Sequence, residues 1–203
     1  MYLGVKMIAE LFALHLFVYW TSVIGFIMYY GQYDDCKKKE VRDGATQVLV
    51  NQLVYTPVYF LPFAHWYPAP LPWVHGVWQL PVIVVMTDVI FYIMHRAFHH
   101  PLLYKHVHSR HHAVYPPVAP TALYSHPAEH VLVNLLSVLA PLFMVRASYS
   151  VAMVWTTFAS LNVVWSHSET DGIHTAHHKY RNCNYGVGLY WMDDIFGTKK
   201  CYK

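Results

Sequence analysis

The sequence has little formal charge. Its 203 residues include 14 Lys+Arg and 11 Asp+Glu, or 12% charged residues, against about 25% in an average soluble domain. A disordered chain would be rich in charge and poor in apolar residues, whereas 56% of these residues are hydrophobic. A net charge of +3 is also too small for a basic nucleic-acid-binding module. The depletion favours a protein embedded in a membrane and predicts no nucleic-acid partner.

Cysteine is scarce as well. The three cysteines are Cys36, Cys183 and Cys201, and their spacing matches no metal-binding or redox motif. We assign them no function. The sequence also shows no internal repeat, no low-complexity linker and no cleavable signal pattern near its N-terminus. We therefore expect a single domain over residues 1–203 that begins with a permanent membrane anchor.

Long uncharged runs separate the few charges. The 44 residues between Asp43 and Asp88 contain no Lys, Arg, Asp or Glu, which leaves room for two membrane helices of about 20 residues each. Prolines and aromatic residues in the stretch 65–72 divide this run, because proline ends a helix and Trp and Tyr favour the membrane interface. The alternative, a soluble protein with a buried core, is disfavoured by the length of these runs. We predict an all-α integral membrane helical bundle of about four to five segments, including hairpins, near residues 7–30, 46–64, 73–94, 131–145 and 147–166.

Basic residues predict the orientation of these segments. Lys and Arg collect on the cytoplasmic side of membrane proteins, and the loop 37–42 holds four of them. If each later pair of segments leaves that side and returns, residues 95–130 and the C-terminal stretch lie on the same side as this loop. Residues 1–94 would then mainly form membrane anchor helices, and a histidine-rich cap would face the cytoplasm. In a eukaryote this arrangement suggests the endoplasmic reticulum.

Histidine is the residue in excess. The sequence has 16 histidines, 13 of them at or after His95, and they include the HxxxH motif of His95 and His99 and two HxxHH motifs. Histidines three or four positions apart lie on one face of a helix, where their imidazoles can share a metal. We interpret these motifs as ligand sets rather than as solvated or core-packing histidines. The expected ligands are His95, His99, His108, His111, His112, His174, His177 and His178.

The number of imidazoles indicates how many metal ions are bound. A structural zinc ion takes four ligands, usually including cysteine, whereas eight histidines without a CxxC motif exceed the needs of one ion. Two ions that share eight or more nitrogens fit better. Imidazole binds iron, copper, nickel and zinc, so the residue types leave the element open.

The motifs also follow one another in a recognisable order. In sequence they are His95-Arg-Ala-Phe-His99-His100-Pro-Leu-Leu-Tyr104, His108-Ser-Arg-His111-His112, Ser125-His126-Pro127-Ala-Glu129, His167-Ser168, His174-Thr-Ala-His177-His178, Asn184-Tyr185-Gly186 and Phe196-Gly197-Thr198. Over residues 88–198 this order resembles the fatty acid hydroxylase and sterol desaturase superfamily. The resemblance implies that residues 88–198 form a fatty acid hydroxylase-like catalytic region.

The resemblance further implies a membrane-bound, non-haem di-iron oxygenase. Such an enzyme uses two iron ions, O2 and two electrons to hydroxylate or desaturate a sterol, fatty acyl or sphingoid substrate. The eight histidines above would be the ligands, and His126 and His167 fall on recurrent family histidines that would complete the set. Two departures are a short loop between His167 and His174, and Asp194 at a position where arginine is usual. The HPGG signature of a haem-binding module is absent, so electrons would come from a separate donor such as cytochrome b5 or a reductase.

Carboxylates near the histidine motifs are candidates for a second layer around the metals. Ligating histidines usually donate their other ring N–H to a carboxylate or a carbonyl. Asp88 is the first candidate, since it lies seven residues, or two helical turns, before His95; Glu129 and Asp171 are the others. We expect no catalytic residue beyond the metal ligands. Aromatic residues that would line a lipid-binding site are Phe91, Tyr92, Phe98 and Trp165.

Two other classes of function remain open from the sequence. A membrane zinc-dependent hydrolase would be expected to carry an HExxH motif with its glutamate base, which the sequence lacks. A non-enzymatic membrane metal-binding or transport protein would place its ligands near the bilayer midplane rather than in helix ends and loops. For an oxygenase, the expected partners are the lipid bilayer, a lipid substrate and an electron-transfer protein.

Overall fold

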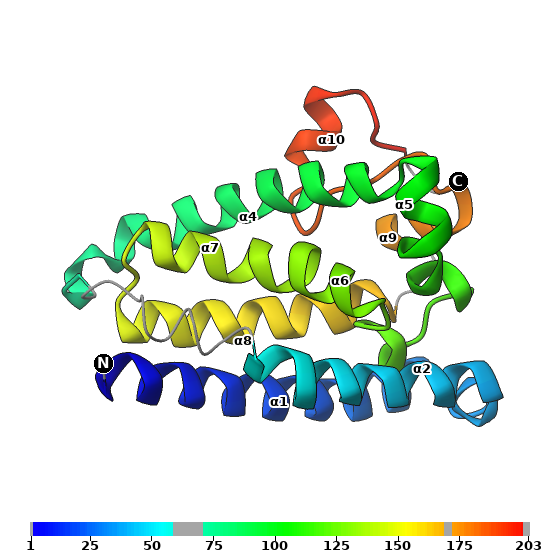
Figure 1. The fold of residues 1–203 in the computed structure, drawn as a ribbon, viewed down its shortest axis with the longest axis horizontal. Helices are drawn as coiled ribbons and strands as arrows, with labels where there is room; N and C mark the ends of the chain where they lie inside the picture. Colours follow the sequence, from blue (N-terminus) through cyan, green and yellow to red (C-terminus); the bar gives the residue numbers. More distant parts are fainter. Residues whose placement is uncertain (1, 59–70, 169–171, 201–203) are drawn as a thin grey trace.

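The computed structural model describes residues 2–58, 71–168 and 172–200 (Figure 1). Over these residues the chain is helical and has no strand, which confirms the expected all-α fold. Short 3-10 turns connect several helices, and π-helical turns at Asn51–Tyr55 and His130–Leu135 continue two of them. The α-helices are α1 (Tyr2–Tyr30), α2 (Lys39–Val50), α4 (Gly76–Phe98), α5 (Pro101–His106), α6 (Pro127–Glu129), α7 (Leu136–Met144), α8 (Tyr149–Ser166), α9 (Ile173–Tyr180) and α10 (Trp191–Ile195).

Three described helical stretches are long and apolar enough to cross a membrane. They are Gly4–Tyr30, Trp73–Phe98 and Pro127–Met144, and they coincide with three of the predicted segments. The last is longer than the predicted 131–145 because Pro127 starts the helix and the His126 side chain accepts a hydrogen bond from the Ala128 N–H. The predicted segment 147–166 is helix α8, which does not meet the same criterion of apolarity. The predicted segment 46–64 is helical as far as residue 58 and then leaves the described residues.

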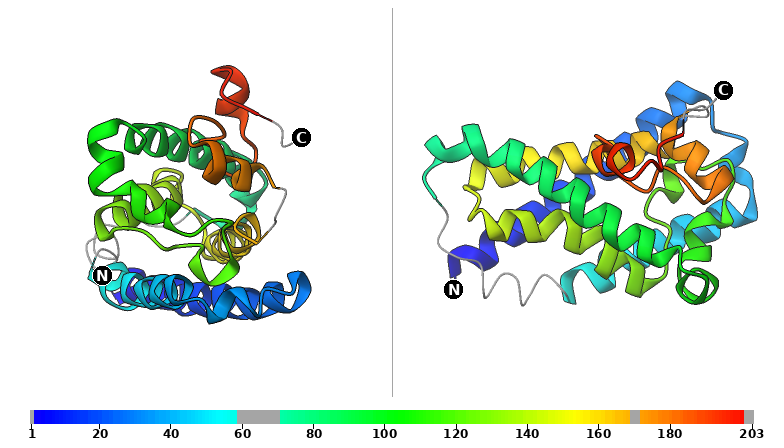
Figure 2. Two further views of the ribbon diagram at one scale, coloured as in Figure 1. Left: turned by 90° about the vertical axis from the view of Figure 1, so that its right-hand side faces the viewer. Right: turned by 90° about the horizontal axis from the view of Figure 1, so that it is seen from above.

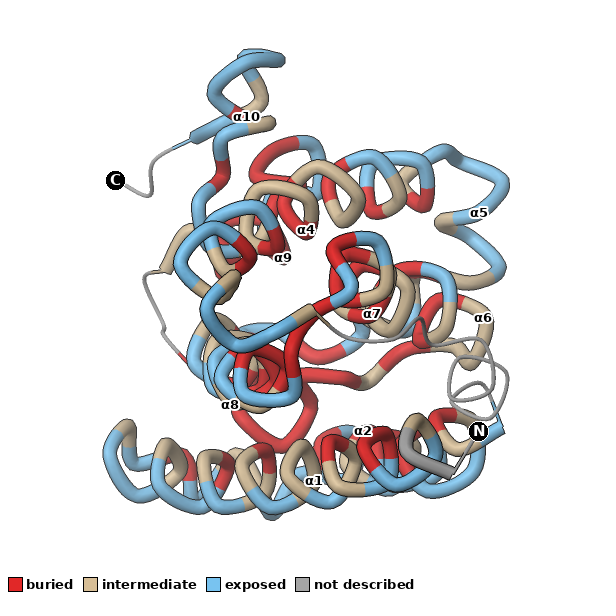
Figure 3. The backbone as a smooth tube through the Cα atoms, turned by 90° about the vertical axis from the view of Figure 1, so that its left-hand side faces the viewer, coloured by how far each residue is buried: buried red, intermediate tan, exposed pale blue. Residues whose placement is uncertain are grey.

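The long helices run along one axis in three layers. Helix α4 forms one outer layer, α7 and α8 the middle one, and α1 with α2 the other outer layer (Figures 2 and 3). One apolar core lies between α1, α4, α7 and α8 and includes Leu11, Ile83, Leu142 and Trp155. Large apolar side chains also cover the outside, for example Phe17 at 68% exposure and Val77 at 88%. An apolar exterior around a packed interior is the pattern expected of a membrane protein.

The histidine motifs all lie at one end of this bundle, next to the loop between α1 and α2 (Figure 1). The chain turns away from the axis of α4 just before Pro101. The residue before a proline avoids the helical region, and His100 is accordingly extended (φ −60, ψ 136). The chain then returns through α5 and the 3-10 turn His108–Ala113. Helix α8 ends at the same end of the bundle and leads to α9. The predicted grouping of the histidine motifs at one end is therefore seen in the fold.

Candidate metal centre

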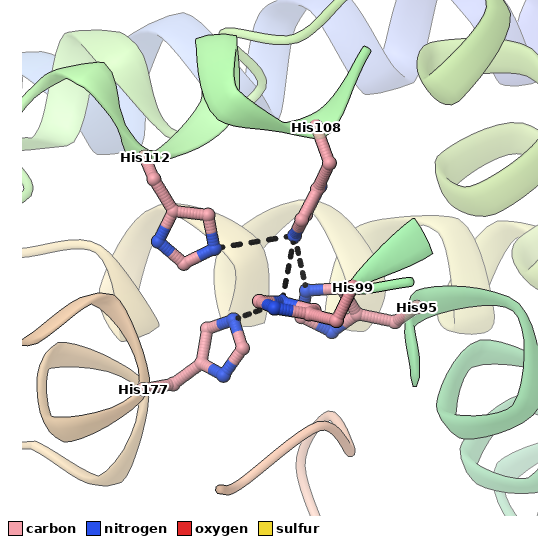
Figure 4. Close-up of side chains that lie close together, drawn as sticks. All are labelled: His95, His99, His108, His112 and His177. Atoms are coloured by element: carbon pink, nitrogen blue, oxygen red, sulfur yellow. Dashed lines mark hydrogen bonds between the residues drawn. The ribbon is translucent and has the colours of Figure 1, made fainter. Parts of the chain in front are cut away.

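Nine histidines gather into two groups whose ring nitrogens could each hold one metal ion. Within each group, one ring nitrogen per residue lies within 4.8 Å of all the others. The two groups adjoin, since the ring centroids of His112 and His178 are 4.6 Å apart. The first group is His95, His99, His108, His112 and His177 (Figure 4), and the second is His111, His167, His174 and His178.

Each HxxHH motif contributes to both groups. Helical spacing led us to expect that the three histidines of a motif would share one face. Instead, His108 and His112 point into the first group and His111 into the second. In α9 the division is reversed, with His177 in the first group and with His174 and His178 in the second. Positions i and i+4 share a group while i+3 diverges, so each motif links the two groups.

The nitrogens of the first group converge on one point. His108 Nε2 lies 2.8 Å from His99 Nε2 and 3.1 Å from the Nε2 atoms of both His95 and His112. One nitrogen with a single lone pair or a single N–H cannot form three such hydrogen bonds at once. Ligands at about 2.0–2.1 Å from a shared ion at right angles to one another would be about 2.9 Å apart. The spacing therefore fits imidazoles that hold one cation.

In five of the nine histidines the opposite ring nitrogen is held by an acceptor. His95 Nδ1 donates to the Tyr185 carbonyl at 2.8 Å, and His177 Nδ1 to the Cys183 carbonyl at 2.7 Å. A proton fixed on Nδ1 leaves the Nε2 lone pair free to bind a metal. The same arrangement is found for His108 Nδ1 with Glu129 Oε1 (2.8 Å), for His111 Nδ1 with the Tyr124 carbonyl (3.1 Å) and for His167 Nδ1 with the Val163 carbonyl (2.8 Å).

The second group has an unpaired member. His174 Nε2 lies 3.0 Å from His167 Nε2, and His167 Nε2 lies 3.5 Å from His111 Nε2. His178 is 3% exposed, and neither of its ring nitrogens has a hydrogen-bond partner among the described residues. Buried polar atoms are nearly always paired. A cation held by this group would give one of the two His178 nitrogens a partner.

Acidification is expected to destabilise the folded protein and to release its metals. Burial, and then the neighbouring imidazoles, holds the pKa of His108, His174 and His178 well below its ordinary value. Below about pH 6.5 the unfolded chain therefore binds more protons than the folded one, so stability falls as the pH decreases. Protons also compete with metal for the same nitrogens. Metal content and Tm should both fall between about pH 7.5 and about pH 5; constant values across this range would contradict the assignment.

The carboxylates predicted near the metals lie in different places. Glu129 is buried and accepts from His108, as expected for a second-layer group. Asp88 does not contact His95: its Oδ2 accepts from the backbone N–H of Met192 at 3.3 Å. Residues 185–192 pack along this face of α4, so that the Tyr185 carbonyl takes the place beside His95 that we expected Asp88 to occupy. Asp171 lies outside the described residues.

His126, the remaining predicted ligand, is in neither group. Its Nδ1 accepts from the Ala128 N–H at 3.1 Å and so begins helix α6. The unusual Asp194 is exposed and pairs with Lys199 at 2.8 Å.

Sequence reasoning missed Asp193. This carboxylate is 0% exposed and accepts from the Tyr185 N–H at 2.8 Å and from the Gly186 N–H and the Thr198 hydroxyl, both at 2.6 Å. It thereby holds the segment around Tyr185, whose carbonyl accepts from His95 Nδ1. The only sequence signal was its place beside Asp194 in the motif that ends in Phe196-Gly197-Thr198.

An apolar cavity of about 270 Å³ runs inside the bundle beside the histidine groups. It is lined by residues of α1, α4, α7 and α8, among them the predicted wall residues Phe91 and Trp165. The ring centroid of Phe91 lies 5.0 Å from that of His95. Tyr92 instead borders a separate surface hollow next to His99, and Phe98 is buried at the end of α4.

Comparison with known proteins agrees with this site. The sequence model of the fatty acid hydroxylase family matches residues 80–198. The chain is 38% identical over 136 residues to a fatty acid hydroxylase of Mycosarcoma maydis, which covers 62% of this chain and 34% of that protein. It is 32% identical over 180 residues to fatty acid hydroxylase domain-containing protein 2 of Homo sapiens (81% of this chain, 54% of that protein). It is 32% identical over 153 residues to a very-long-chain aldehyde decarbonylase of Oryza sativa subsp. japonica (66% and 57%).

The family to which a chain with these histidine groups belongs can therefore be named. This chain belongs to the fatty acid hydroxylase family. It spans between 34% and 57% of the length of the three relatives above. No solved structure matches the chain significantly. The names of these relatives include a hydroxylase and a decarbonylase, so the reaction has to be argued from the site itself.

Proposed function

We propose that this protein is a membrane-bound, non-haem di-iron oxygenase that hydroxylates or desaturates a lipid. It would use O2 and electrons from a separate donor such as cytochrome b5 or a reductase. The observation that carries the proposal is the pair of adjoining histidine groups beside an apolar cavity. An all-imidazole ligand set suits iron, and the cavity suits a lipid chain.

Some residues of the site would bind the metal ions, and others orient the imidazoles that bind them. The Nε2 atoms of the first group and the ring nitrogens of the second would hold the two irons, which supply the oxidation of an unactivated C–H bond when bound. The Nδ1 contacts to Tyr185, Cys183 and Glu129 keep these imidazoles in one tautomer and one orientation. Phe91 packs against His95 and lines the apolar cavity.

The position of Glu129 argues against a zinc hydrolase. Such an enzyme needs a carboxylate base beside an open metal position. Glu129 instead uses Oε1 to orient His108 from behind the ligand. Asp88 and Asp193 bind backbone N–H groups of the C-terminal segment. None of these three carboxylates is placed to activate a metal-bound water.

Glu129→Gln is expected to weaken metal binding about 10–100-fold, the usual effect of losing a partner behind a ligating histidine. Gln keeps the size of the side chain but replaces the carboxyl group that accepts from His108 Nδ1 with an amide. Chelator competition with the purified protein measures this. Glu10→Gln is the matched control, because Glu10 pairs with Lys6 on the exposed side of α1. Equal metal affinity of both variants and the unchanged protein would contradict the role of Glu129.

We further propose that the histidine end of the bundle faces the cytoplasm and that the protein resides in the endoplasmic reticulum of a eukaryote. The loop between α1 and α2 lies at that end and carries four of the basic residues that mark a cytoplasmic face. Arg96 borders the surface hollow beside His99. A basic group in that position suits an acidic electron donor.

The activity is tested by lipidomics under isotopically labelled O2. Cells that express the protein are compared with cells that express His111→Ala, which removes a candidate ligand of the second group. We expect a lipid product that appears only with the unchanged protein. Label in the product identifies hydroxylation, and an unlabelled double bond identifies desaturation. Identical lipid profiles in the two cultures would contradict an oxygenase function.

A further inference from the structure

A second buried polar cluster lies within the bundle, apart from the metal ligands. It consists of His15 of α1, Gln52 and Thr56, which follow α2, His130 at the start of the second π-helical turn, and Ser160 of α8. All of these except His15 are at most 2% exposed. His15, Thr56, His130 and Ser160 line the apolar cavity. Polar side chains at membrane depth are costly and usually have a function.

One half of this cluster is internally satisfied. The Gln52 amide donates to His15 Nε2 at 3.1 Å, which leaves the proton of His15 on Nδ1. His15 Nδ1 then donates to Ser160 Oγ at 2.8 Å, and the Ser160 hydroxyl donates to the Thr156 carbonyl at 2.7 Å. Every polar atom in this chain of bonds has one consistent role, so the chain is already ordered without a ligand.

The other half leaves one acceptor unused. The Thr56 hydroxyl donates to the Asn51 carbonyl at 3.1 Å, so its oxygen accepts from His130 Nε2 at 2.9 Å. A neutral imidazole with its proton on Nε2 presents a lone pair at Nδ1. His130 Nδ1 is buried and has no partner among the described residues. An unpaired buried acceptor is unfavourable. Because His130 lines the cavity, a lipid donor group that reaches Nδ1 would satisfy it.

The backbone at this position is also unusual. The π-helical turn Asn51–Tyr55 ends immediately before Thr56, and the π-helical turn His130–Leu135 begins at His130. Such turns occur frequently at functional sites. Two of them therefore meet at the Thr56–His130 contact, and both of these residues line the cavity.

The charge of the lining limits what can bind. The described residues that line the cavity include no Lys, Arg, Asp or Glu. A carboxylate or phosphate would be buried there without a counter-charge, which costs much more than burying a neutral group. The cavity also borders the metal centre, through Phe91 beside His95 and through Val163, whose carbonyl accepts from His167 Nδ1. A lipid in this cavity can contact His130 and at the same time lie next to the metal centre.

We propose that His130 Nδ1 is a specificity-determining acceptor for an uncharged donor group, a hydroxyl or an amide N–H, on the lipid substrate. The substrate class is then a neutral alcohol or amide lipid rather than a free fatty acid. This inference rests on the proposed function and deepens it, because the hydrogen bond at His130 fixes how far along the lipid the oxidised carbon lies.

The test is equilibrium binding of radiolabelled dodecanol to the purified full chain, in competition with dodecyl methyl ether and laurate. The ether has the same chain but no donor, and laurate carries a charge. We expect dodecanol to bind about five- to tenfold more tightly than the ether, the value of one net hydrogen bond. Laurate should bind more weakly than the ether, because its carboxylate would be buried without a counter-charge. His130→Phe should remove this preference. His130→Gln should restore it, because the Gln amide can donate to Thr56 and accept from the ligand.

Val138→Ala is the matched control. Val138 lines the same cavity without a polar side-chain atom, so this variant should weaken all three probes alike. Equal affinity for dodecanol and its methyl ether in the unchanged protein would overturn the proposal even if His130→Phe does not fold. An undiminished preference in a folded His130→Phe would mean that only a water satisfies Nδ1, and would overturn it as well.

The proposed function can fail separately. His111→Ala removes a candidate metal ligand but none of the cavity lining, so it should lose lipid oxidation and keep the preference for dodecanol. A chain that prefers dodecanol but oxidises no lipid supports the subsite and refutes the oxygenase. A chain that oxidises lipids but shows no preference refutes the subsite alone.

Discussion

His108→Ala should abolish lipid oxidation and reduce the metal content from two ions to one per chain. His108 Nε2 is the atom nearest to the other nitrogens of the first group, at 2.8 to 3.1 Å from three of them. The variant would remove this central ligand and leave Glu129 without its partner. The loss of activity should exceed about 100-fold, the upper limit for residues that only support a ligand. The second group contains no His108 nitrogen and should keep its ion.

The control for this variant is His106→Ala. His106 lies two residues earlier, is exposed and belongs to neither group. It should keep both metals and full turnover. Metal analysis and product formation by the two purified variants check the prediction. Two ions and normal turnover in His108→Ala would contradict metal binding by the first group.

Asp193→Ala should destabilise the protein by at least about 1–3 kcal/mol, the usual cost of leaving a buried donor without its acceptor. Its carboxylate accepts from the backbone of Tyr185 and Gly186 and from Thr198. Without it, buried donors lose their acceptor, and the Tyr185 carbonyl that orients His95 is released. We therefore expect a lower Tm together with weaker metal binding.

The neighbouring Asp194 supplies a matched control. Asp194→Ala breaks only an exposed pair with Lys199, which contributes about 0–1 kcal/mol. Gly186→Ala tests the same contact from the other side, because a Cβ at Gly186 would lie 2.8 Å from Asp193 Oδ2. Gly25→Ala, where nothing lies within 4 Å of the added Cβ, should be neutral. Equal Tm values for Asp193→Ala and Asp194→Ala would contradict the role of Asp193.

The grouping of the candidate ligands was predictable because its signal is local. Spacings of three and four residues are visible in one dimension, and nine of the ten predicted histidines lie in the two groups. The division of each HxxHH motif between the groups was not predictable, since it depends on how α9 faces the turn at 108–113. His126 belongs to a similar motif, but the proline that follows it makes it a helix cap instead.

The partners of the ligands were harder to predict than the ligands. Most of them are backbone carbonyls, such as those of Tyr185 and Cys183, and a carbonyl has no signature in a sequence. Asp88 has the right helical spacing from His95, but a segment about 100 residues later in the chain covers that face of α4. The polar cluster around His130 was missed for the same reason, because Thr56 and His130 come from distant segments.

The membrane fold was predicted from missing charge. Most of each candidate span, Gly4–Tyr30, Trp73–Phe98 and Pro127–Met144, lies within one of the uncharged runs. Helix α8 shows why the number of membrane segments is harder to predict than the membrane fold itself. Its buried Thr156 and Ser160 face the interior of the bundle, which lowers its hydropathy although it packs in the middle layer against α1 and α4.

If the two adjoining histidine groups hold two iron ions, the metals of the purified full chain should identify them. After iron-replete expression, metal analysis combined with a Mössbauer spectrum should find two irons per chain in nitrogen-rich sites, both lost on acidification. Zinc as the only bound metal, or a single iron per chain, would contradict this assignment.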